Sequence, residues 1–225
     1  SVKDVLSVVK ALNLPSNTSA LDLGCGKGVL ALTLASELGF NVIGIDAFEP
    51  FVLDAKQNGG KLGVSDLCSF YCLDLREQIK KKQQFDMAFF LAVGPVLGNL
   101  GETVCKIRNV VRSDGYIIID DGFLADNACL QQKRGPYVSH KDTISQLTSC
   151  GDVLVKEVIP SLGDIKEVNA YNTSMIKKRA GLLSKQHPEL KNLFDGYVAV
   201  QEKESAIMGT TFVPALWVLK KSSPI

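Results

Sequence analysis

Residues 20–28, read Ala-Leu-Asp-Leu-Gly-Cys-Gly-Lys-Gly, constrain the fold of this chain more than any other segment. A short strand-forming run leads directly into three glycines at alternate positions, and the next residues place Leu30, Leu34 and Leu38 on one helical face. Glycine adopts backbone angles that other residues avoid and lets a ligand approach the main chain. The segment therefore predicts a strand, a tight glycine bend and a helix whose free N–H groups face a ligand.

Short apolar runs alternate with helical patterns along most of the chain, which is typical of a parallel sheet wrapped by helices. The predicted strands are residues 20–23, 41–45, 68–73, 85–91, 116–119, 152–159 and 211–220. The predicted helices are residues 2–12, 29–38, 49–62, 103–111 and 143–150, with a turn at Asp114 and Gly115. The expected fold class is α/β, a three-layer, Rossmann-like sheet of seven strands in one domain over residues 1–225.

Residues 165–207 depart from this alternation, because their pattern is helical throughout. His187 and Pro188 interrupt the pattern, and Pro188 suits the first residue of a new helix. We therefore expect a helical insertion before the last strand. Because the sheet would be occupied by the ligand of the glycine bend, specificity for a substrate is expected to lie in the insertion. We expect the insertion to form a substrate lid. The same helices could instead form a dimer interface, so a monomer and a homodimer both remain open.

Acidic side chains close the next two predicted strands. Asp46 ends the second strand, 18 residues after Gly28, where a carboxylate can accept hydrogen bonds from both hydroxyls of a ribose. Asp74 ends the third strand, where it could accept from an adenine amino group, and Phe48 could cover the adenine ring. Ligands of open parallel sheets bind at the carboxyl ends of the strands, so these residues are expected to share one site. Taken singly, the glycines fit a simple turn and the two acids fit helix N-caps.

Residues 21–28 resemble the nucleotide-binding motif of class I S-adenosylmethionine-dependent methyltransferases, and the helical insertion resembles that of small bacterial members. Residues 45–46 resemble the family's ribose-binding acid, residues 73–75 its adenine-side acid, and residues 85–88 its fourth strand. The predicted strand at 211–220 resembles the family's antiparallel seventh strand, so the resemblance implies a mostly parallel sheet with an antiparallel last strand.

This resemblance implies S-adenosyl-L-methionine as the cofactor and S-adenosyl-L-homocysteine as its product. The implied cofactor contacts are Asp22, Gly24, Cys25, Gly26, Gly28, Asp46, Ala47, Phe48, Leu73, Asp74, Leu91 and Ala92. Asp22, Gly24 and Gly26 would lie beside the methionine part of the cofactor. Residues 91, 92 and 94, just past the fourth strand, would border the methyl group.

Two segments depart from the family's patterns. Tyr116 follows Ser113-Asp114-Gly115 where a second glycine is usual, which affects a turn and not the cofactor. Residues 91–95, Leu-Ala-Val-Gly-Pro, replace the Asn/Asp-Pro-Pro-aromatic motif of DNA adenine and protein glutamine methylation. We therefore expect a small-molecule acceptor and direct in-line methyl transfer, with carbon, oxygen, nitrogen and arsenic-type acceptor atoms all open.

Two other functions fit parts of the same pattern. A regulatory or interaction module would bind the cofactor without catalysing transfer. An NAD-dependent oxidoreductase would use G-x-G-x-x-G, but Val29 stands where the third glycine belongs, and that family lacks the acid corresponding to Asp74. Methyl transfer is the function that the combined pattern favours.

Few side chains are candidates for a base that takes a proton from the acceptor. Asp120 and Asp121 end the fifth predicted strand near the expected acceptor pocket, and turn capping is the alternative. His140 precedes a predicted helix and His187 precedes a proline, so a surface or capping role suits both. The candidate substrate contacts are Gly94, Tyr171, Arg179 and Tyr197, with core packing of the tyrosines and a solvated arginine as alternatives.

The overall charge indicates no nucleic-acid or membrane partner, because 25 basic and 24 acidic residues leave a net charge of +1. The basic cluster at residues 80–82 is expected to be a solvated helix end and loop, with a local anion contact as the alternative. No apolar run reaches the roughly 18–20 residues that a membrane span needs. The six cysteines complete no zinc pattern, and several lie in apolar runs, so we expect no metal, reduced thiols and a cytoplasmic setting.

Overall fold

The computed structural model describes residues 1–126 and 137–222. The chain divides into two compact units, which are described separately. The first unit comprises Ser1–Asp121, Lys141–Val158 and Leu216–Ile225, and the second comprises Gly122–His140 and Ile159–Ala215.

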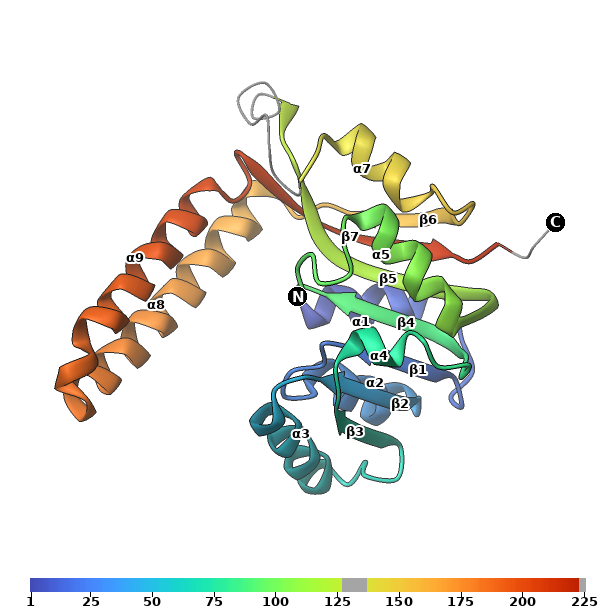
Figure 1. Ribbon diagram of the computed structural model, residues 1–225, viewed down its shortest axis with the longest axis horizontal. Coiled ribbons are helices and arrows are strands. Elements are labelled where there is room, and N and C mark those ends of the chain that lie inside the picture. The colour runs from blue at the N-terminus through green and yellow to red at the C-terminus, as the bar shows by residue number, and fades with distance from the viewer. Residues whose placement is uncertain (127–136, 223–225) are drawn as a thin grey trace. The chain divides into compact units, whose positions relative to one another are not determined.

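A seven-stranded sheet organises the fold, in the order β3-β2-β1-β4-β5-β7-β6 (Figure 1). Its strands are β1 (Ser19–Leu23), β2 (Asn41–Asp46), β3 (Cys68–Cys72), β4 (Phe85–Leu91), β5 (Val111–Leu124), β6 (Val153–Val158) and β7 (Phe212–Lys220). Strand β1 pairs in parallel with β2 and β4, β2 with β3, and β4 with β5, whereas β6 and β7 are antiparallel. The predicted fold class, a Rossmann-like sheet that is mostly parallel with an antiparallel last strand, is confirmed.

Helices connect these strands. They are α1 (Val2–Ala11), α2 (Val29–Leu38), α3 (Glu49–Leu62), α4 (Leu75–Gln78), α5 (Leu100–Ile107), α7 (His140–Leu147), α8 (Leu162–Gln186) and α9 (Lys191–Ile207), with 3-10 turns η1 (Arg108–Val110) and η2 (Pro188–Leu190). Strand order reverses between β1 and β4, since the chain runs from β1 outward through β2 to β3 and then returns to β4. Open parallel sheets bind ligands at the carboxyl ends of the strands beside such a reversal.

The hydrophobic core follows from the two-residue period of the strands. Met87 and Phe89 of β4 belong to one buried cluster with apolar residues of α1, α2 and α3, so these helices pack on one face of the sheet. Ala88 and Phe90 alternate with them, are also buried, and lie outside that cluster. The apolar run of β4 is therefore buried on both faces, as predicted.

Strand β5 differs most from its predicted bounds, because it begins at Val111 and continues to Leu124. The expected turn is present as a bulge inside the strand: pairing with β4 shifts between Phe85 and Met87, and Asp114 has a φ of 63°. The predicted helix at 103–111 is wrong in its bounds. It is α5, which begins at Leu100 after a capping box of Asn99 and Glu102, followed by η1.

The cysteines differ in part from expectation. Cys105, in α5, and Cys150, after α7, form a disulfide with a Cα–Cα distance of 5.7 Å. The prediction that all thiols are reduced is therefore wrong for this pair, while Cys25, Cys68 and Cys72 are free. Cys129 lies outside the described residues. This disulfide is hard to predict from the sequence, because the two cysteines are 45 positions apart and only the tertiary fold brings them together.

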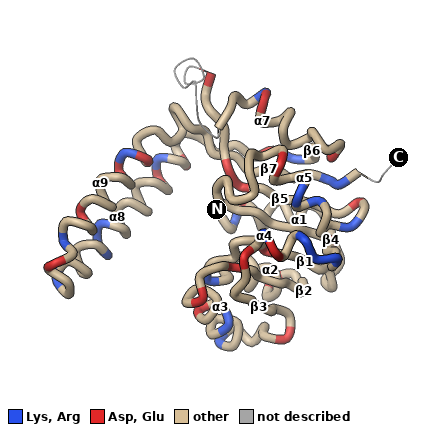
Figure 2. Tube along the Cα trace, in the orientation of Figure 1, with Lys and Arg blue, Asp and Glu red and all other residues tan. Residues whose placement is uncertain are grey.

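In the second unit, α8 and α9 form a helical hairpin (Figure 1). Ser161 and Asp164 form a capping box at the start of α8, and His187 ends this helix before Pro188 starts η2. Thr173 Oγ1 lies 3.2 Å from Ser205 Oγ across the hairpin, and Figure 2 shows acidic and basic residues interspersed along both helices. Of the two helices, only Ile165 is buried. Among the described residues, no helix is both long and apolar enough to cross a membrane.

Candidate functional site

The glycine bend after β1 is held by the end of β2. The amides of Gly24 and Cys25 donate to the carbonyl of Ile45 at 2.8 and 3.0 Å, and the amide of Gly28 donates to the carbonyl of Cys25 at 2.9 Å. Gly24, Gly26 and Gly28 have φ values of +78°, +52° and +77°, which only glycine adopts readily. The backbone angles of the bend are therefore sufficient reason for glycine at all three positions.

Asp46 is tied to this bend through its side chain. Its Oδ2 accepts a hydrogen bond of 2.8 Å from the amide of Gly26, and its Oδ1 accepts one of 2.9 Å from the amide of Phe48. These two bonds fix the carboxylate at the carboxyl end of β2. Each oxygen keeps a lone pair for a further donor. The structure thus brings together the glycine bend and the acid predicted to lie beside it.

Asp22 of β1 is a buried acid at the base of the bend. It is 3% exposed, and its Oδ2 has no hydrogen-bond partner among the described residues. Burial, and secondarily the charge of Asp46, raises the pKa of Asp22 to about 7. Burial also raises the pKa of the Cys25 thiol, so this cysteine stays protonated. A buried carboxylate without a partner is costly, and it would be compensated by a cationic or hydrogen-donating ligand group.

The segment after β4 closes over the bend. A Cβ on Gly24 would lie 2.6 Å from Cγ2 of Val93, so the two segments are in close contact. Ala92 has a φ of 52°, which is unusual for a residue with a side chain, and its amide donates to the carbonyl of Asp120 at 2.8 Å. Such strain concentrates at functional sites. Sequence reasoning missed Val93, whose only signal is its place directly after the buried strand.

Two aromatic residues flank the site at the start of α3, where Phe48 is the N-cap residue and Phe51 lies in the first turn. Phe48 and Phe51 lie edge to face with their ring centroids 4.8 Å apart, and the two residues are 53% and 38% exposed. The Nζ of Lys27 lies 5.6 Å from the centroid of the Phe51 ring and 2.7 Å from Oδ2 of Asp54. An exposed aromatic pair beside the glycine bend offers an apolar surface to a planar ligand.

Asp74 follows β3 and has a structural role. Its Oδ1 accepts from the amide of Arg76 at 2.8 Å, which caps the start of α4, a helix that the sequence analysis did not predict. The Arg76 side chain also donates to both carboxylate oxygens, to Oδ1 through Nε and to Oδ2 through Nε and one terminal nitrogen. These hydrogen bonds lower the pKa of Asp74 to about 2. Asp74 is therefore a helix N-cap, which was the alternative to a ligand-binding role. If its carboxylate also contacts adenine, it does so while bound to Arg76.

The candidate bases occupy different surroundings. Asp120 and Asp121 lie inside β5, so the prediction that they end the strand is wrong, although Asp120 pairs in register with Leu91 at the last residue of β4. Burial raises the pKa of Asp120. His140 begins α7 and lies against Phe123, with 4.6 Å between the ring centroids.

Within the described ranges, no group of three or more histidine, cysteine, aspartate or glutamate residues is arranged to hold a metal ion.

The candidate substrate residues of the insertion are on the hairpin surface. Tyr171 and Tyr197 are 64% and 57% exposed, so the alternative that they pack in a core is wrong. Arg179 is exposed, and His187 is exposed at the end of α8 with its Nδ1 3.5 Å from Oε1 of Glu189. Periodicity alone could not separate these residues from a core stripe, because a helical hairpin with a narrow seam has the same spacing.

Comparison with known proteins agrees with this geometry. The sequence profile of a family described as "Methyltransferase domain" matches residues 14–191. Sterol 4-C-methyltransferase strm-1 of Caenorhabditis elegans is 24% identical over 164 residues, which are 72% of this chain and 45% of that protein. The ubiquinone biosynthesis O-methyltransferase of Rickettsia canadensis is 31% identical over 108 residues, 46% of this chain and 42% of that protein. The chain spans less than half the length of these relatives.

Solved structures share the whole fold. A SAM-dependent methyltransferase from Geobacter sulfurreducens, solved in complex with S-adenosyl-L-homocysteine, superimposes with a TM-score of 0.81 at 19% identity, over 97% of this chain and 90% of that one. YjhP from E. coli has a TM-score of 0.81 at 16% identity, over 99% and 93%. The [4+2]-cyclase SpnF has a TM-score of 0.68 at 17% identity, over 94% and 77%. At these identities the likeness concerns the fold alone.

Proposed function

This chain belongs to the methyltransferase-domain family, as its class I resemblance predicted, and from that membership we propose that it binds S-adenosyl-L-methionine and transfers the methyl group to a small-molecule acceptor. The observation that carries the proposal is the hydrogen bond from the Gly26 amide to Asp46 Oδ2. It joins a bend that admits a ligand to a carboxylate that accepts from hydroxyls, at the carboxyl edge of the sheet.

The residues present fit this cofactor. The unpartnered Oδ2 of Asp22 would accept a hydrogen bond from the ammonium group of the methionine part. Asp46 would accept from the two ribose hydroxyls with its remaining lone pairs. A Cβ on Gly26 would meet nothing within 4 Å, so the bend leaves open space there for a ligand. Phe48 would cover the adenine, and Asp74 would accept from its amino group alongside Arg76.

The bound cofactor would supply an electrophilic methyl group on a sulfonium centre. The chain's own residues would bind the cofactor, orient the acceptor and exclude water. Leu91, Ala92 and Gly94, after β4, would border the transferred methyl, and alignment of an acceptor at about 3–3.5 Å would provide much of the acceleration. Asp120 is the base that we favour for a hydroxyl or amine acceptor, because burial raises its pKa and its backbone adjoins Ala92. Asp121 and His140 remain weaker candidates.

The acceptor is proposed to be small and largely apolar. Two relatives are named for sterol and ubiquinone chemistry. The hairpin of α8 and α9 exposes apolar side chains, among them Tyr171, Met175, Leu193 and Tyr197. We propose that this hairpin helps to select the acceptor as a lid, with Tyr171, Arg179 and Tyr197 among its contacts.

Thermal unfolding with S-adenosyl-L-homocysteine and, separately, with NAD tests the cofactor assignment. A ligand at 100 times its dissociation constant adds about 2.7 kcal/mol. For a chain of this length, each kcal/mol raises the midpoint by roughly 2–4 °C. We expect a shift with S-adenosyl-L-homocysteine only, and a shift with NAD alone would overturn the assignment.

Turnover separates an enzyme from a cofactor-binding module. Purified protein is incubated with S-adenosyl-L-methionine and a panel of phenols, catechols, amines and sterols, and the formation of S-adenosyl-L-homocysteine is measured. Acceptor-dependent product supports methyl transfer. Tight cofactor binding without product for any acceptor in the panel would favour a regulatory or interaction module.

A further inference from the structure

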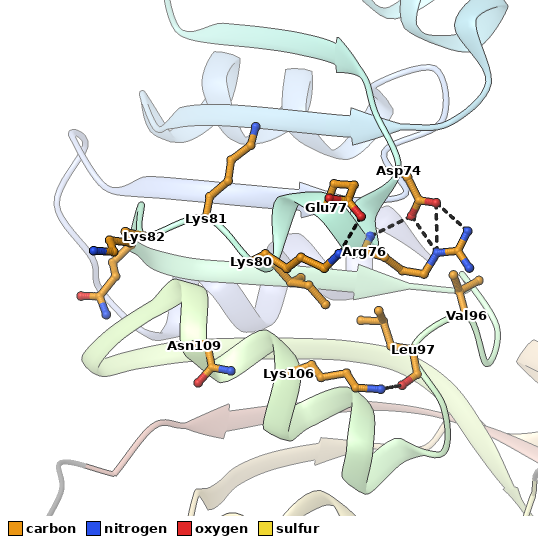
Figure 3. A pocket seen from close by; sticks show the side chains of 12 residues that line it. Asp74, Arg76, Glu77, Lys80, Lys81, Lys82, Val96, Leu97, Lys106 and Asn109 are labelled. Atoms are coloured by element: carbon orange, nitrogen blue, oxygen red, sulfur yellow. Dashed lines mark hydrogen bonds and ion pairs between the residues drawn. The ribbon is translucent and has the colours of Figure 1, made fainter.

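A groove with an excess of positive charge lies between α4 and α5 in the first unit. Its volume is about 1100 Å³, slightly above the roughly 300–1,000 Å³ that is usual for small-molecule sites. It is lined by the segment from Asp74 to Gln84 on one side and by Val96, Leu97, Lys106 and Asn109 on the other. Figure 3 shows Lys80 in the middle of the groove, with Arg76 towards one end and Lys82 towards the other.

The charges that line the groove do not balance. Five cations, Arg76, Lys80, Lys81, Lys82 and Lys106, face two acids, Asp74 and Glu77. The net charge of +3 in one groove exceeds the +1 of the whole chain. A concave surface of one sign focuses the electrostatic field and attracts counter-ions. The groove therefore favours an anionic occupant, and of its lining residues the proposed methyl transfer uses Asp74 alone.

The hydrogen bonds and ion pairs of these cations show which of them have N–H donors available to a ligand. Arg76 is held by Asp74, and Lys80 Nζ lies 2.7 Å from Oε1 of Glu77. Lys81 and Lys82 form no ion pair within the described ranges. On the opposite wall, Lys106 donates to the carbonyl of Leu97 at 2.6 Å, which leaves two of its three N–H donors available.

The two walls set the chemistry of the ligand. Lys81 and Lys82 belong to the loop after α4, whereas Lys106 belongs to α5. Figure 3 shows their three amino groups pointing in different directions, so we expect that a single anionic group would not contact all of them. Gln84 and Asn109 add amide donors to the same surface. We propose that this groove binds a small polyanion, a molecule with two or more phosphate groups, through Lys81, Lys82 and Lys106. A nucleic acid is less favoured, because the charge excess is confined to the groove and the rest of the chain is balanced.

Calorimetric titration of the full chain with sodium tripolyphosphate tests the proposal. We expect saturable binding to one site, with orthophosphate at least tenfold weaker because it cannot bridge both walls. The variant Lys81→Gln/Lys82→Gln is expected to bind tripolyphosphate roughly five- to tenfold more weakly, since each exposed charge contributes modestly. Lys106→Gln should weaken binding to a similar degree.

The matched control is Lys61→Gln/Lys178→Gln, which removes two exposed charges from α3 and α8, outside the groove. It should bind tripolyphosphate as the wild type does. An equal loss in this control, or no loss in the groove variants, would overturn the proposal, and so would tighter binding of a 12-nucleotide RNA than of tripolyphosphate. Thermal midpoints of all variants, measured without ligand, check that each one is folded.

Discussion

The amide of Gly26 donates a hydrogen bond of 2.8 Å to Oδ2 of Asp46. The two residues are 20 positions apart, and parallel pairing of β1 with β2 brings their strand ends together. The bond means that the bend and the carboxylate are preorganised as one unit. A ligand that binds both loses little free energy to ordering them.

Replacing Asp46 with alanine is expected to weaken binding of S-adenosyl-L-homocysteine. The variant loses the acceptor for two ribose hydroxyls, and a hydrogen bond to a charged group contributes about 1.5–3 kcal/mol. We expect a loss of roughly 10- to 100-fold in affinity, measured by calorimetry. Asp66→Ala, which removes an exposed acid before β3, is the control and should bind normally. Unchanged affinity of Asp46→Ala would mean that the ribose does not contact this carboxylate.

The space above Gly26 is tested by a pair of glycine replacements. Gly26 and Gly63 have φ values of +52° and +69°, and an added Cβ would meet nothing within 4 Å at either position. Gly26→Ala and Gly63→Ala should therefore each lose about 1–2 kcal/mol of stability from backbone strain. Only Gly26→Ala should also lose affinity for S-adenosyl-L-homocysteine, because its methyl group enters the proposed site. Equal affinities in the two variants would argue against a ligand at the bend.

The placement of the glycine bend beside Asp46 was predictable because it depends on local and periodic features of the sequence. Strand ends, glycines and acids follow one another in register, and parallel pairing brings them to one edge. The role of Arg76 was not predictable from such spacing. Its contact with Asp74 depends on a four-residue helix that is too short to have a periodic pattern.

Other differences come from tertiary context. Strand β5 continues through Asp120 and Asp121 to Leu124, although two consecutive acids are typical of a strand end. The disulfide of Cys105 with Cys150 depends on how α5 lies against the segment after α7, which no local pattern encodes. Tyr171 is exposed although its spacing fits an apolar stripe, since Ile165 alone is buried among the residues of α8.

The raised pKa of Asp22 predicts a stability that depends on pH. The carboxyl group titrates near 3.8 when unfolded and near 7 when folded, so the folded state holds the extra proton between these values. Stability should therefore fall as the pH rises from about 4 to about 7, by an amount on the order of 4 kcal/mol, and stay level above that range. Asp22→Asn should flatten this part of the profile in urea unfolding measured from pH 4 to 8. A wild-type profile as flat as that of the variant would contradict the raised pKa.

Removing the α8–α9 hairpin tests its role as a lid. Strands β6 and β7 are antiparallel neighbours, and Val158 pairs with Leu216, so a short turn can join them in place of residues 160–213. The shortened chain is expected to keep its affinity for S-adenosyl-L-homocysteine within about twofold, because Asp22, Gly26 and Asp46 are all retained. Turnover with any acceptor identified for the full chain should be lost. A folded, cofactor-binding deletion variant with undiminished turnover would show that the hairpin takes no part in acceptor selection.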